Sequence, residues 1–204
     1  NYSVKVGIFI SLPSTFSLIF LALPIVNIIY QRGAFSEIDT IQTANALILF
    51  SLGLPAFVLN KILLPIFYAN YDNKILFKIT LYTVLLNIIL NIILMFPFGY
   101  LGIAVGSTIS AWINVFLLVS KAKNYVDFKI DSTTYYFSLK VFFLSIIISL
   151  IIHIYNSFYF ANINDLILTA KLLRLLLILV IAKSIFLFLS ILFKLHISLG
   201  INAK

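Results

Sequence analysis

The stretch IDTIQTANALILFSLGLPAFVLNKILLPIFYANYD, which runs from Ile38 to Asp72, decides how this chain is organised. It is mostly apolar and more than thirty residues long, yet its interior carries a lysine, Lys61. Gly53, Pro55 and Pro65 interrupt the same run. A charge and helix-disturbing residues destabilise a segment that lies in lipid, and in transporters such segments usually line a path through the bilayer.

The composition of the whole chain places it in a membrane. Hydrophobic residues make up 63% of the 204 residues, charged residues make up 10%, and the mean hydropathy is +1.16. A soluble domain is usually about half apolar and about a quarter charged, so a soluble core could not bury this much apolar surface. The chain is therefore an integral membrane protein. It contains no cysteine, which excludes disulfides and thiolate metal sites.

Six stretches are long and apolar enough to cross a bilayer, because ~30 Å of hydrocarbon takes about 20 helical residues. They are Val6–Tyr30, Thr40–Tyr71, Ile75–Phe98, Leu101–Val119, Leu139–Phe160 and Leu172–Phe193. The second stretch is overlong, and we expect it to kink near Pro55 and Pro65. No alternation of polarity typical of barrel strands is present. The predicted fold is an all-α, polytopic transmembrane helical bundle.

Membrane topology explains the net charge of +8 better than nucleic-acid binding does, since the basic residues are scattered. If the first span runs from inside to outside, nine basic residues fall inside and three outside. The inner ones are Lys5, Lys74, Lys78, Lys121, Lys123, Lys129, Lys140, Lys194 and Lys204, and the outer ones are Arg32, Lys171 and Arg174. This asymmetry predicts that both ends are cytoplasmic. The chain begins at Asn1, and we expect it to be a piece of a longer protein or a processed product.

Signatures of a soluble enzyme are missing. His153 and His196 lie far apart, and the six acidic residues all fall in predicted loops or at helix ends. They form no carboxylate pair, nucleophile triad, phosphate-binding loop or metal-ligand cluster. We therefore expect no enzymatic activity, no cofactor and no resident metal.

Two lysines within the predicted spans are candidates for substrate binding. Lys61 lies between helix-loosening residues, which favours a position facing a cavity where it meets an anionic headgroup. It also lies only ~15 Å along the helix from Tyr71, so snorkelling to the interface is an equal alternative. Lys183 lies about 18 Å from Lys171 along its helix, where snorkelling is harder and a groove-facing position is favoured.

A second candidate site lies between the third and fourth predicted spans. Polar residues at steps of three and four align on one face of the third span, and small residues form a stripe on the fourth. They are Thr80, Thr83, Asn87 and Asn91, and Gly102, Gly106, Ser107, Ser110 and Asn114. Hydrogen bonding at a tight helix contact is one interpretation. The other is a small-cation site made by Asn87, Asn91 and Ser107 with backbone oxygens.

The last two predicted spans are almost wholly Leu, Ile, Val and Phe. This composition is typical of a plain lipid-facing surface. An alternative is an apolar groove for an isoprenoid tail, with Lys183 nearby.

Several short motifs, taken together, resemble one transporter family. They are Leu12-Pro13-Ser14, Leu23-Pro24-Ile25, Tyr30-Gln31-Arg32-Gly33-Ala34-Phe35, Gly53-Leu54-Pro55-Ala56-Phe57, Lys61, Pro65, Phe67-Tyr68-Ala69, Leu101-Gly102-Ile103-Ala104 and Ser110-Ala111-Trp112-Ile113-Asn114. The chain is similar to the carboxy-terminal part of the MurJ/MviN family of lipid II flippases, within the multidrug/oligosaccharidyl-lipid/polysaccharide exporter superfamily. The resemblance covers nearly the whole chain and weakens after about Lys123.

The resemblance implies a larger two-lobed bundle of fourteen helices, of which these spans would be the last six. Residues 1–123 would then be part of the carboxy-terminal transporter lobe, and residues 124–204 two further helices that form a groove for the lipid tail. The implied substrate is undecaprenyl-linked peptidoglycan precursor, moved across the bacterial inner membrane by alternating access. Coupling to Na⁺ or H⁺ and a need for the amino-terminal half follow from the same resemblance.

The chain also departs from the family pattern. Asn70 stands where the family usually has a basic residue, and Ile75-Leu76 stands where a threonine-proline pair is usual. The family's pyrophosphate-binding arginines lie in earlier helices, which have no counterpart here. We therefore expect part of a lipid II flippase. A flippase for another polyprenyl-linked glycan and a non-functional remnant of a split gene are the alternatives.

Overall fold

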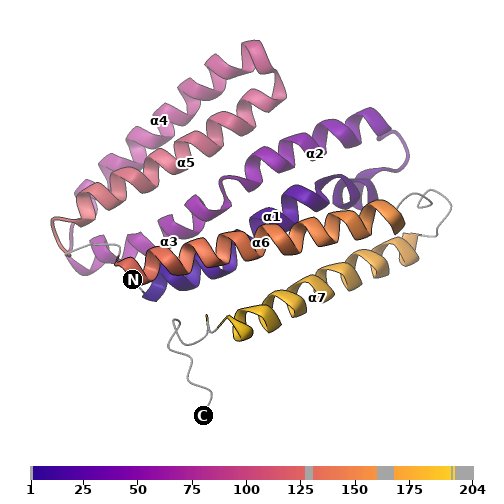
Figure 1. Cartoon of the computed structure of the whole chain (residues 1–204). Coiled ribbons are helices and arrows are strands. Elements are labelled where there is room, and N and C mark those ends of the chain that lie inside the picture. Colours follow the sequence, from indigo (N-terminus) through magenta and orange to yellow (C-terminus); the bar gives the residue numbers. More distant parts are fainter. Residues whose placement is uncertain (1, 127–130, 160–167, 194, 196–204) are drawn as a thin grey trace.

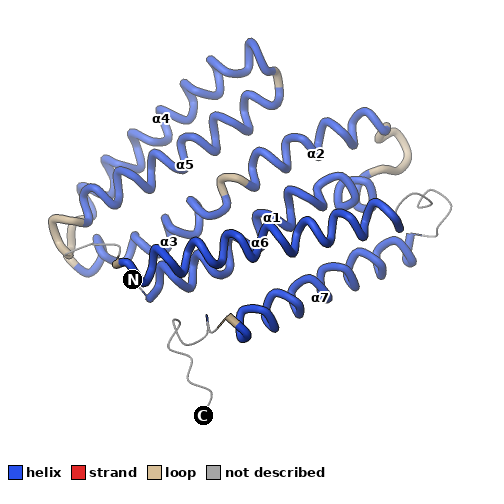
Figure 2. The backbone as a smooth tube through the Cα atoms, viewed as in Figure 1, coloured by secondary structure: helices blue, strands red, loops and turns tan. Residues whose placement is uncertain are grey.

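The computed structural model describes residues 2–126, 131–159, 168–193 and 195. These residues form seven helices and no strand (Figures 1 and 2). The helices are α1 (Tyr2–Tyr30), α2 (Glu37–Ser51), α3 (Leu54–Ala69), α4 (Asn73–Phe98), α5 (Tyr100–Ala122), α6 (Ser132–Tyr159) and α7 (Leu168–Leu192). Because α2 and α3 together form one long apolar segment, the described residues contain six helical segments able to cross a membrane. The predicted all-helical, six-span fold is confirmed.

The overlong second span breaks once, at Leu52 and Gly53, between α2 and α3. Pro55 occupies the first turn of α3, where its missing N–H costs no helical hydrogen bond. Pro65 was expected to disturb the helix too, but α3 continues through it. The predicted break is therefore confirmed at Pro55, and Pro65 instead leaves the Lys61 carbonyl without its usual helical donor.

Side chains of α5 bind the backbone at this break. The Thr108 hydroxyl donates to the Leu49 carbonyl over 2.8 Å, and the Trp112 indole N–H donates to the Leu52 carbonyl over 3.1 Å. A carbonyl without a partner at membrane depth costs several kcal/mol by order of magnitude. These two bonds make the break compatible with lipid and hold it against α5.

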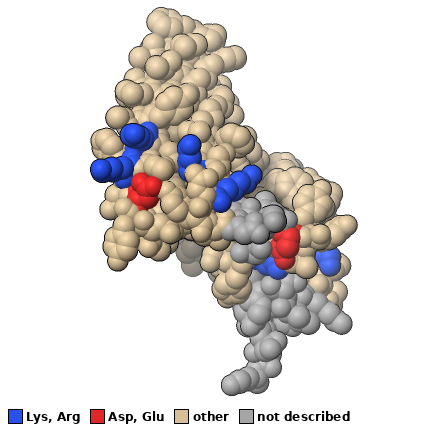
Figure 3. Space-filling model, turned by 90° about the vertical axis from the view of Figure 1, so that its left-hand side faces the viewer, with Lys and Arg blue, Asp and Glu red and all other residues tan. Residues whose placement is uncertain are grey.

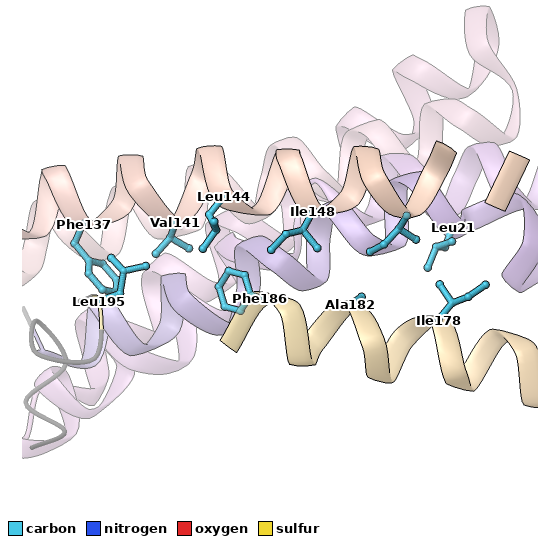
Figure 4. Close-up of a cluster of buried hydrophobic side chains, with 10 residues drawn as sticks. Leu21, Phe137, Val141, Leu144, Ile148, Ile178, Ala182, Phe186 and Leu195 are labelled. Carbon is cyan, nitrogen blue, oxygen red and sulfur yellow. The ribbon is translucent and has the colours of Figure 1, made fainter. Parts of the chain in front are cut away.

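Helix α1 lies at the centre of the arrangement and packs against α2, α3, α6 and α7 (Figure 1). On one side of it, α5 packs on α2 and α3 and carries α4 outward as an antiparallel hairpin. On its other side, α6 and α7 bury an apolar cluster that includes Leu21 of α1, Val141 and Ile148 of α6, and Phe186 of α7 (Figure 4). A separate cluster joins α3, α4 and α5.

Most of the lysines predicted on the inner side lie at one end of the bundle, where α1, α4 and α6 begin and α5 ends. Figure 3 views this end and shows basic side chains in a band across it. The Lys5 ammonium donates to the Thr133 hydroxyl over 3.1 Å and so joins α1 to α6. Lys129, Lys194 and Lys204, predicted on the same side, lie outside the described residues. The assignment of this end to the cytoplasm stays a prediction.

The Tyr125 hydroxyl donates to the Asp72 carboxylate and ties the end of α5 to the turn between α3 and α4. This bond and the Ile75 N–H lower the pKa of Asp72, and nearby Lys74 and Lys78 add to the effect. The same bond raises the pKa of Tyr125. Both groups lie at the basic end, outside the membrane-spanning segments.

Candidate functional site

Two glycines bring α4 and α5 into direct backbone contact. A Cβ atom on Gly102 would lie 2.1 Å from the Leu94 carbonyl oxygen, and one on Gly106 would lie 2.3 Å from the Asn91 side-chain oxygen. Any side chain at these positions would push the helices apart. The predicted close approach is therefore confirmed, and it places the amides of α4 against the hydroxyls of α5.

A hydrogen-bonded chain connects the two helices. The Asn91 amide donates to the Asn87 side-chain oxygen over 3.0 Å, and the Asn87 amide donates to the Ser110 hydroxyl over 2.7 Å. Ser110 in turn donates to the Ser107 carbonyl over 2.9 Å. The predicted trio of Asn87, Asn91 and Ser107 is thus linked, and Ser110 is the residue that joins Asn87 to Ser107.

A polar cleft of about 420 Å³ adjoins this chain of bonds. Residues of α2, α3, α4 and α5 line it: Phe50, Phe57, Asn60, Thr83, Val84, Asn87, Ser107, Ser110, Ala111 and Asn114. Asn87 and Ser107 face the cleft, whereas Asn91 does not line it. Asn60 was missed by the sequence reasoning. Its signal was a polar residue directly before Lys61 in an apolar run.

The groups in this cleft that could bind a small hard cation are all neutral oxygens, from amides and hydroxyls. The side-chain oxygen of Asn114, which lines the cleft, is buried without a hydrogen-bond partner. The oxygen of Asn91 also lacks a partner, but it lies against Gly106 and outside the cleft. Amide oxygens are ligands that Na⁺-like and Ca²⁺-like ions accept. No group of three His, Cys, Asp or Glu side chains gathers within the described residues, and His196 lies outside them. The cleft could hold a cation only weakly, because it lacks a carboxylate.

Lys61 lies on an exposed stripe of α3, together with Phe57, Pro65 and Tyr68. These residues are three or four positions apart and so share one face of the helix. Phe57 and the neighbouring Asn60 line the polar cleft, but Lys61 does not. An exposed ammonium this far inside a span is costly without a polar or anionic partner, and among the described residues none hydrogen-bonds or ion-pairs with it.

Lys183 lies in a different part of the bundle. It lines two adjoining cavities, both of which also include Pro13 and Ser17 of α1. The larger of these cavities has a volume of about 250 Å³. The groove-facing position favoured for Lys183 agrees with this placement, but the structure does not bring Lys183 and Lys61 to a common cavity. Binding of a substrate by either lysine stays a prediction.

Comparisons with known proteins agree with the helix arrangement. A family model described as "Lipid II flippase MurJ" matches residues 1–172. The chain belongs to this family. The match extends beyond Lys123, through α6 and into α7, so the family relationship continues past the last of the short motifs, which ends at Asn114.

Individual MurJ relatives show how much of the family's length is present. A probable lipid II flippase MurJ of Rickettsia prowazekii is 44% identical over 166 residues, which cover 79% of this chain and 33% of that protein. One of Buchnera aphidicola subsp. Acyrthosiphon pisum is 40% identical over 121 residues, covering 59% and 24%. The chain therefore spans about a third or less of the length of these curated relatives.

A solved structure supports the same relationship. It is described as lipid II flippase MurJ in an inward closed conformation, and it matches with a TM-score of 0.65 at 28% sequence identity. The match covers 90% of this chain and 37% of the solved one. The fold of this multi-pass membrane protein is thus a MurJ fold over the part that the chain contains.

Proposed function

We propose that this chain is the carboxy-terminal part of a lipid II flippase, which moves undecaprenyl-linked peptidoglycan precursor across the bacterial inner membrane by alternating access. The observation that carries the proposal is the family match over residues 1–172. The similarity to a solved MurJ over 90% of the chain supports it. Because the matched residues cover only 33% of the Rickettsia prowazekii relative, the activity requires the amino-terminal half of the transporter.

The two parts of the chain have separate roles in this proposal. Residues 1–123 contribute four spans of the transporter lobe, and residues 124–204 contribute two helices that guide the lipid tail. Two apolar cavities between α6 and the region of α7 support the second role, with volumes of about 290 Å³ and 240 Å³. Isoleucines from both helices line the smaller one, so an isoprenoid chain would meet only apolar surface there.

Lys61 supplies positive charge to the headgroup in this proposal. Its exposed stripe on α3 would face the opposite lobe, where a charged side chain has water and an anionic ligand to contact. Lys183 is the second proposed substrate contact. Both ends of the chain are cytoplasmic in this arrangement, and the basic end of the bundle faces the cytoplasm.

Coupling to a cation is assigned to the contact between α4 and α5. Asn87, Asn91 and Ser107 provide neutral oxygens there, and transport coupled to Na⁺ or H⁺ would act through them. The unpartnered oxygen of Asn114, which lines the adjoining cleft, supports this assignment. A weak site is compatible with coupling, because an ion that drives transport must also leave.

The test is complementation of a bacterial strain depleted of its own flippase, with the natural protein that carries this chain. We expect rescued growth and loss of the accumulated lipid II. Lys61→Ala should reduce flipping in proteoliposomes, with Lys123→Ala at the basic end as the control. If the depleted strain accumulates a different polyprenyl-linked glycan, that glycan is the substrate in place of lipid II. Rescued growth without any change in lipid-linked precursors would refute a transport function.

A further inference from the structure

The surroundings of Lys183 contain more polar groups than a lipid-tail groove needs. One of its two cavities is lined by Ser17 of α1 and by Ser145 and Ser149 of α6. The other is lined by Ser14, Ser17, Leu18 and Leu179. Two helices, α1 and α6, thus contribute hydroxyl groups to the cavities that Lys183 of α7 lines.

These groups all lie deep within their helices. Lys183 is ~16 Å along the helix from Leu172 and ~14 Å from Leu192, the ends of its candidate span. Ser17 and Ser149 are likewise near the middle of α1 and α6. The backbone of Lys183 is therefore near the bilayer centre, and its side chain is exposed there, where an uncompensated charge is costly.

No described residue compensates this charge. The four acidic residues within the described ranges are Glu37, Asp39, Asp72 and Asp131, and none of them lines either cavity. The Lys183 ammonium makes no hydrogen bond or ion pair with a described residue, so its three N–H donors are available to a ligand.

Two of the serines also have unused hydrogen-bonding capacity. Ser149 is only 1% exposed, lines the cavity, and makes no hydrogen bond within the described residues. Ser17 likewise has no partner there, whereas Ser145 and Ser14 donate to the carbonyls of Val141 and Ile10. An unpaired hydroxyl on a side chain as buried as that of Ser149 is unusual and costs free energy, whereas Ser17 is half-buried.

We propose that Lys183 and Ser17 bind the phosphate group of an anionic amphiphile in the cavity of about 250 Å³, with Ser149 in the adjoining cavity of about 30 Å³, and that the apolar chain lies along α1 and α7. An ammonium with hydroxyl donors is complementary to phosphate oxygens, and charge-assisted bonds of this kind are strong at low dielectric. The mid-membrane depth selects an amphiphile over a free ion, and Leu18 and Leu179 supply apolar contact for its chain. This site would belong to the proposed flippase, and the inference rests on the proposed function only for the choice of a prenyl phosphate as the probe.

The test is photolabelling of the natural protein in nanodiscs with a photoreactive farnesyl phosphate, followed by mass spectrometry of the labelled peptides. We expect labels on the segments around Leu18 and Leu179. Lys183→Met should reduce this labelling about tenfold or more, as loss of a charge-assisted bond implies. Lys183→Arg should retain it, and Ser149→Ala should weaken it by a smaller factor. Lys140→Met is the matched control, because Lys140 lines a different, apolar cavity.

Competitors identify the source of the phosphate. Unlabelled farnesyl phosphate should displace the probe and farnesol should not. Competition by phosphatidic acid would support the same site with a bulk phospholipid as its ligand, and competition by inorganic phosphate would assign it to a free anion. Equal competition by farnesol, or unchanged labelling in Lys183→Met, would overturn the proposal.

The alternative to a phosphate ligand is an ion pair between Lys183 and a carboxylate elsewhere in the natural protein. Thermal unfolding distinguishes the two. Without ligand, Lys183→Met should raise the midpoint, because it removes an uncompensated charge. A lowered midpoint with no phosphate-dependent labelling would show a protein carboxylate partner and refute the site. Flipping measured in the same preparation keeps the two proposals apart: phosphate-dependent labelling without flipping would refute only the transport function.

Discussion

The α4–α5 hairpin and the α6–α7 pair are both antiparallel helix pairs, but they are held together in different ways. In the hairpin, Gly102 allows backbone contact and Asn87 bonds to Ser110 across the interface. The α6–α7 pair is joined by apolar side chains such as Ile148, Ile178 and Phe186 (Figure 4). An apolar cavity also lies between these two helices.

This difference follows from what lipid does to helix association. Apolar side chains gain little by leaving lipid for protein, so helices in a membrane are joined by close packing and by polar bonds. The hairpin has both, and its geometry is tightly specified. The α6–α7 pair has mainly replaceable apolar contacts, which suits helices that admit a lipid chain.

The strongest way to break the hairpin is Gly102→Ala. The new Cβ would meet the Leu94 carbonyl, a backbone atom that cannot rotate away. We expect a loss of about 3 kcal/mol, or failure to assemble, measured as thermal unfolding in detergent. Gly7→Ala is the matched control, because its Cβ would meet the terminal methyl of Ile62, which can move. Equal losses for the two variants would contradict the argument.

A smaller effect is expected when the polar bond of the hairpin is removed. Asn87→Leu deletes the amide that bonds Ser110 and leaves Asn91 without its acceptor. Interhelical hydrogen bonds of this kind are worth roughly 0.6–2 kcal/mol. Asn45→Leu, at an exposed position of α2, is the control and should change the midpoint little.

The same variant tests the proposed cation site. Na⁺ added at constant ionic strength should raise the unfolding midpoint of the natural protein and should not raise that of Asn87→Leu. A Na⁺-dependent shift that survives in Asn87→Leu would remove Asn87 from the site. The role of the Asn87 side chain would then be its hydrogen bond to Ser110, which stabilises the hairpin.

The α6–α7 pair should tolerate truncation better. Ile148→Ala leaves a space at the buried interface, which costs about 2–5 kcal/mol in a water-soluble core. Here lipid chains can enter the adjoining apolar cavity, so we expect a loss of about 1 kcal/mol. Ile147→Ala, on the lipid-exposed face, should cost still less. A loss as large as that of Gly102→Ala would show that the two pairs are equally specific.

The contrast also separates what the sequence could predict from what it could not. Apolar length predicts the six spans, and the spacing of Gly102 and Gly106 predicts the tight hairpin, because both signals are local. The bonds of Thr108 and Trp112 to the break before α3 join residues about 60 positions apart, so no local pattern contains them.

The candidate site was predictable to a similar degree. Helical spacing correctly aligned Asn87 with Asn91, but it could not show that Gly106 places Asn91 beside the α5 backbone and outside the cleft. Nor could it show which helices face Lys183, since this depends on how α1, α6 and α7 pack. The uniformly apolar sequence of α6 and α7 does not predict which of their faces pack against α1.

The smallest effect concerns the start of α6, where Asp131 accepts hydrogen bonds from the Thr133 and Thr134 hydroxyls and from the Thr134 N–H. These bonds lower the pKa of Asp131 from 3.8 to about 2, and nearby Lys5 adds to the effect. A carboxyl whose pKa is lowered by folding stabilises the folded state above its ordinary pKa and loses that contribution as the pH falls toward the folded value.

Asp131→Asn should therefore weaken the first turn of α6 by the same small amount at every pH from about 8 to about 5. The difference from the natural protein should shrink between about pH 4 and about pH 2, where the natural carboxyl becomes protonated. Hydrogen exchange of the Thr134 and Tyr135 amides measures it directly. A difference that has already vanished at pH 5 would show that these bonds do not lower the pKa. The group is exposed, so the effect stays local to α6 and leaves the α4–α5 hairpin unchanged.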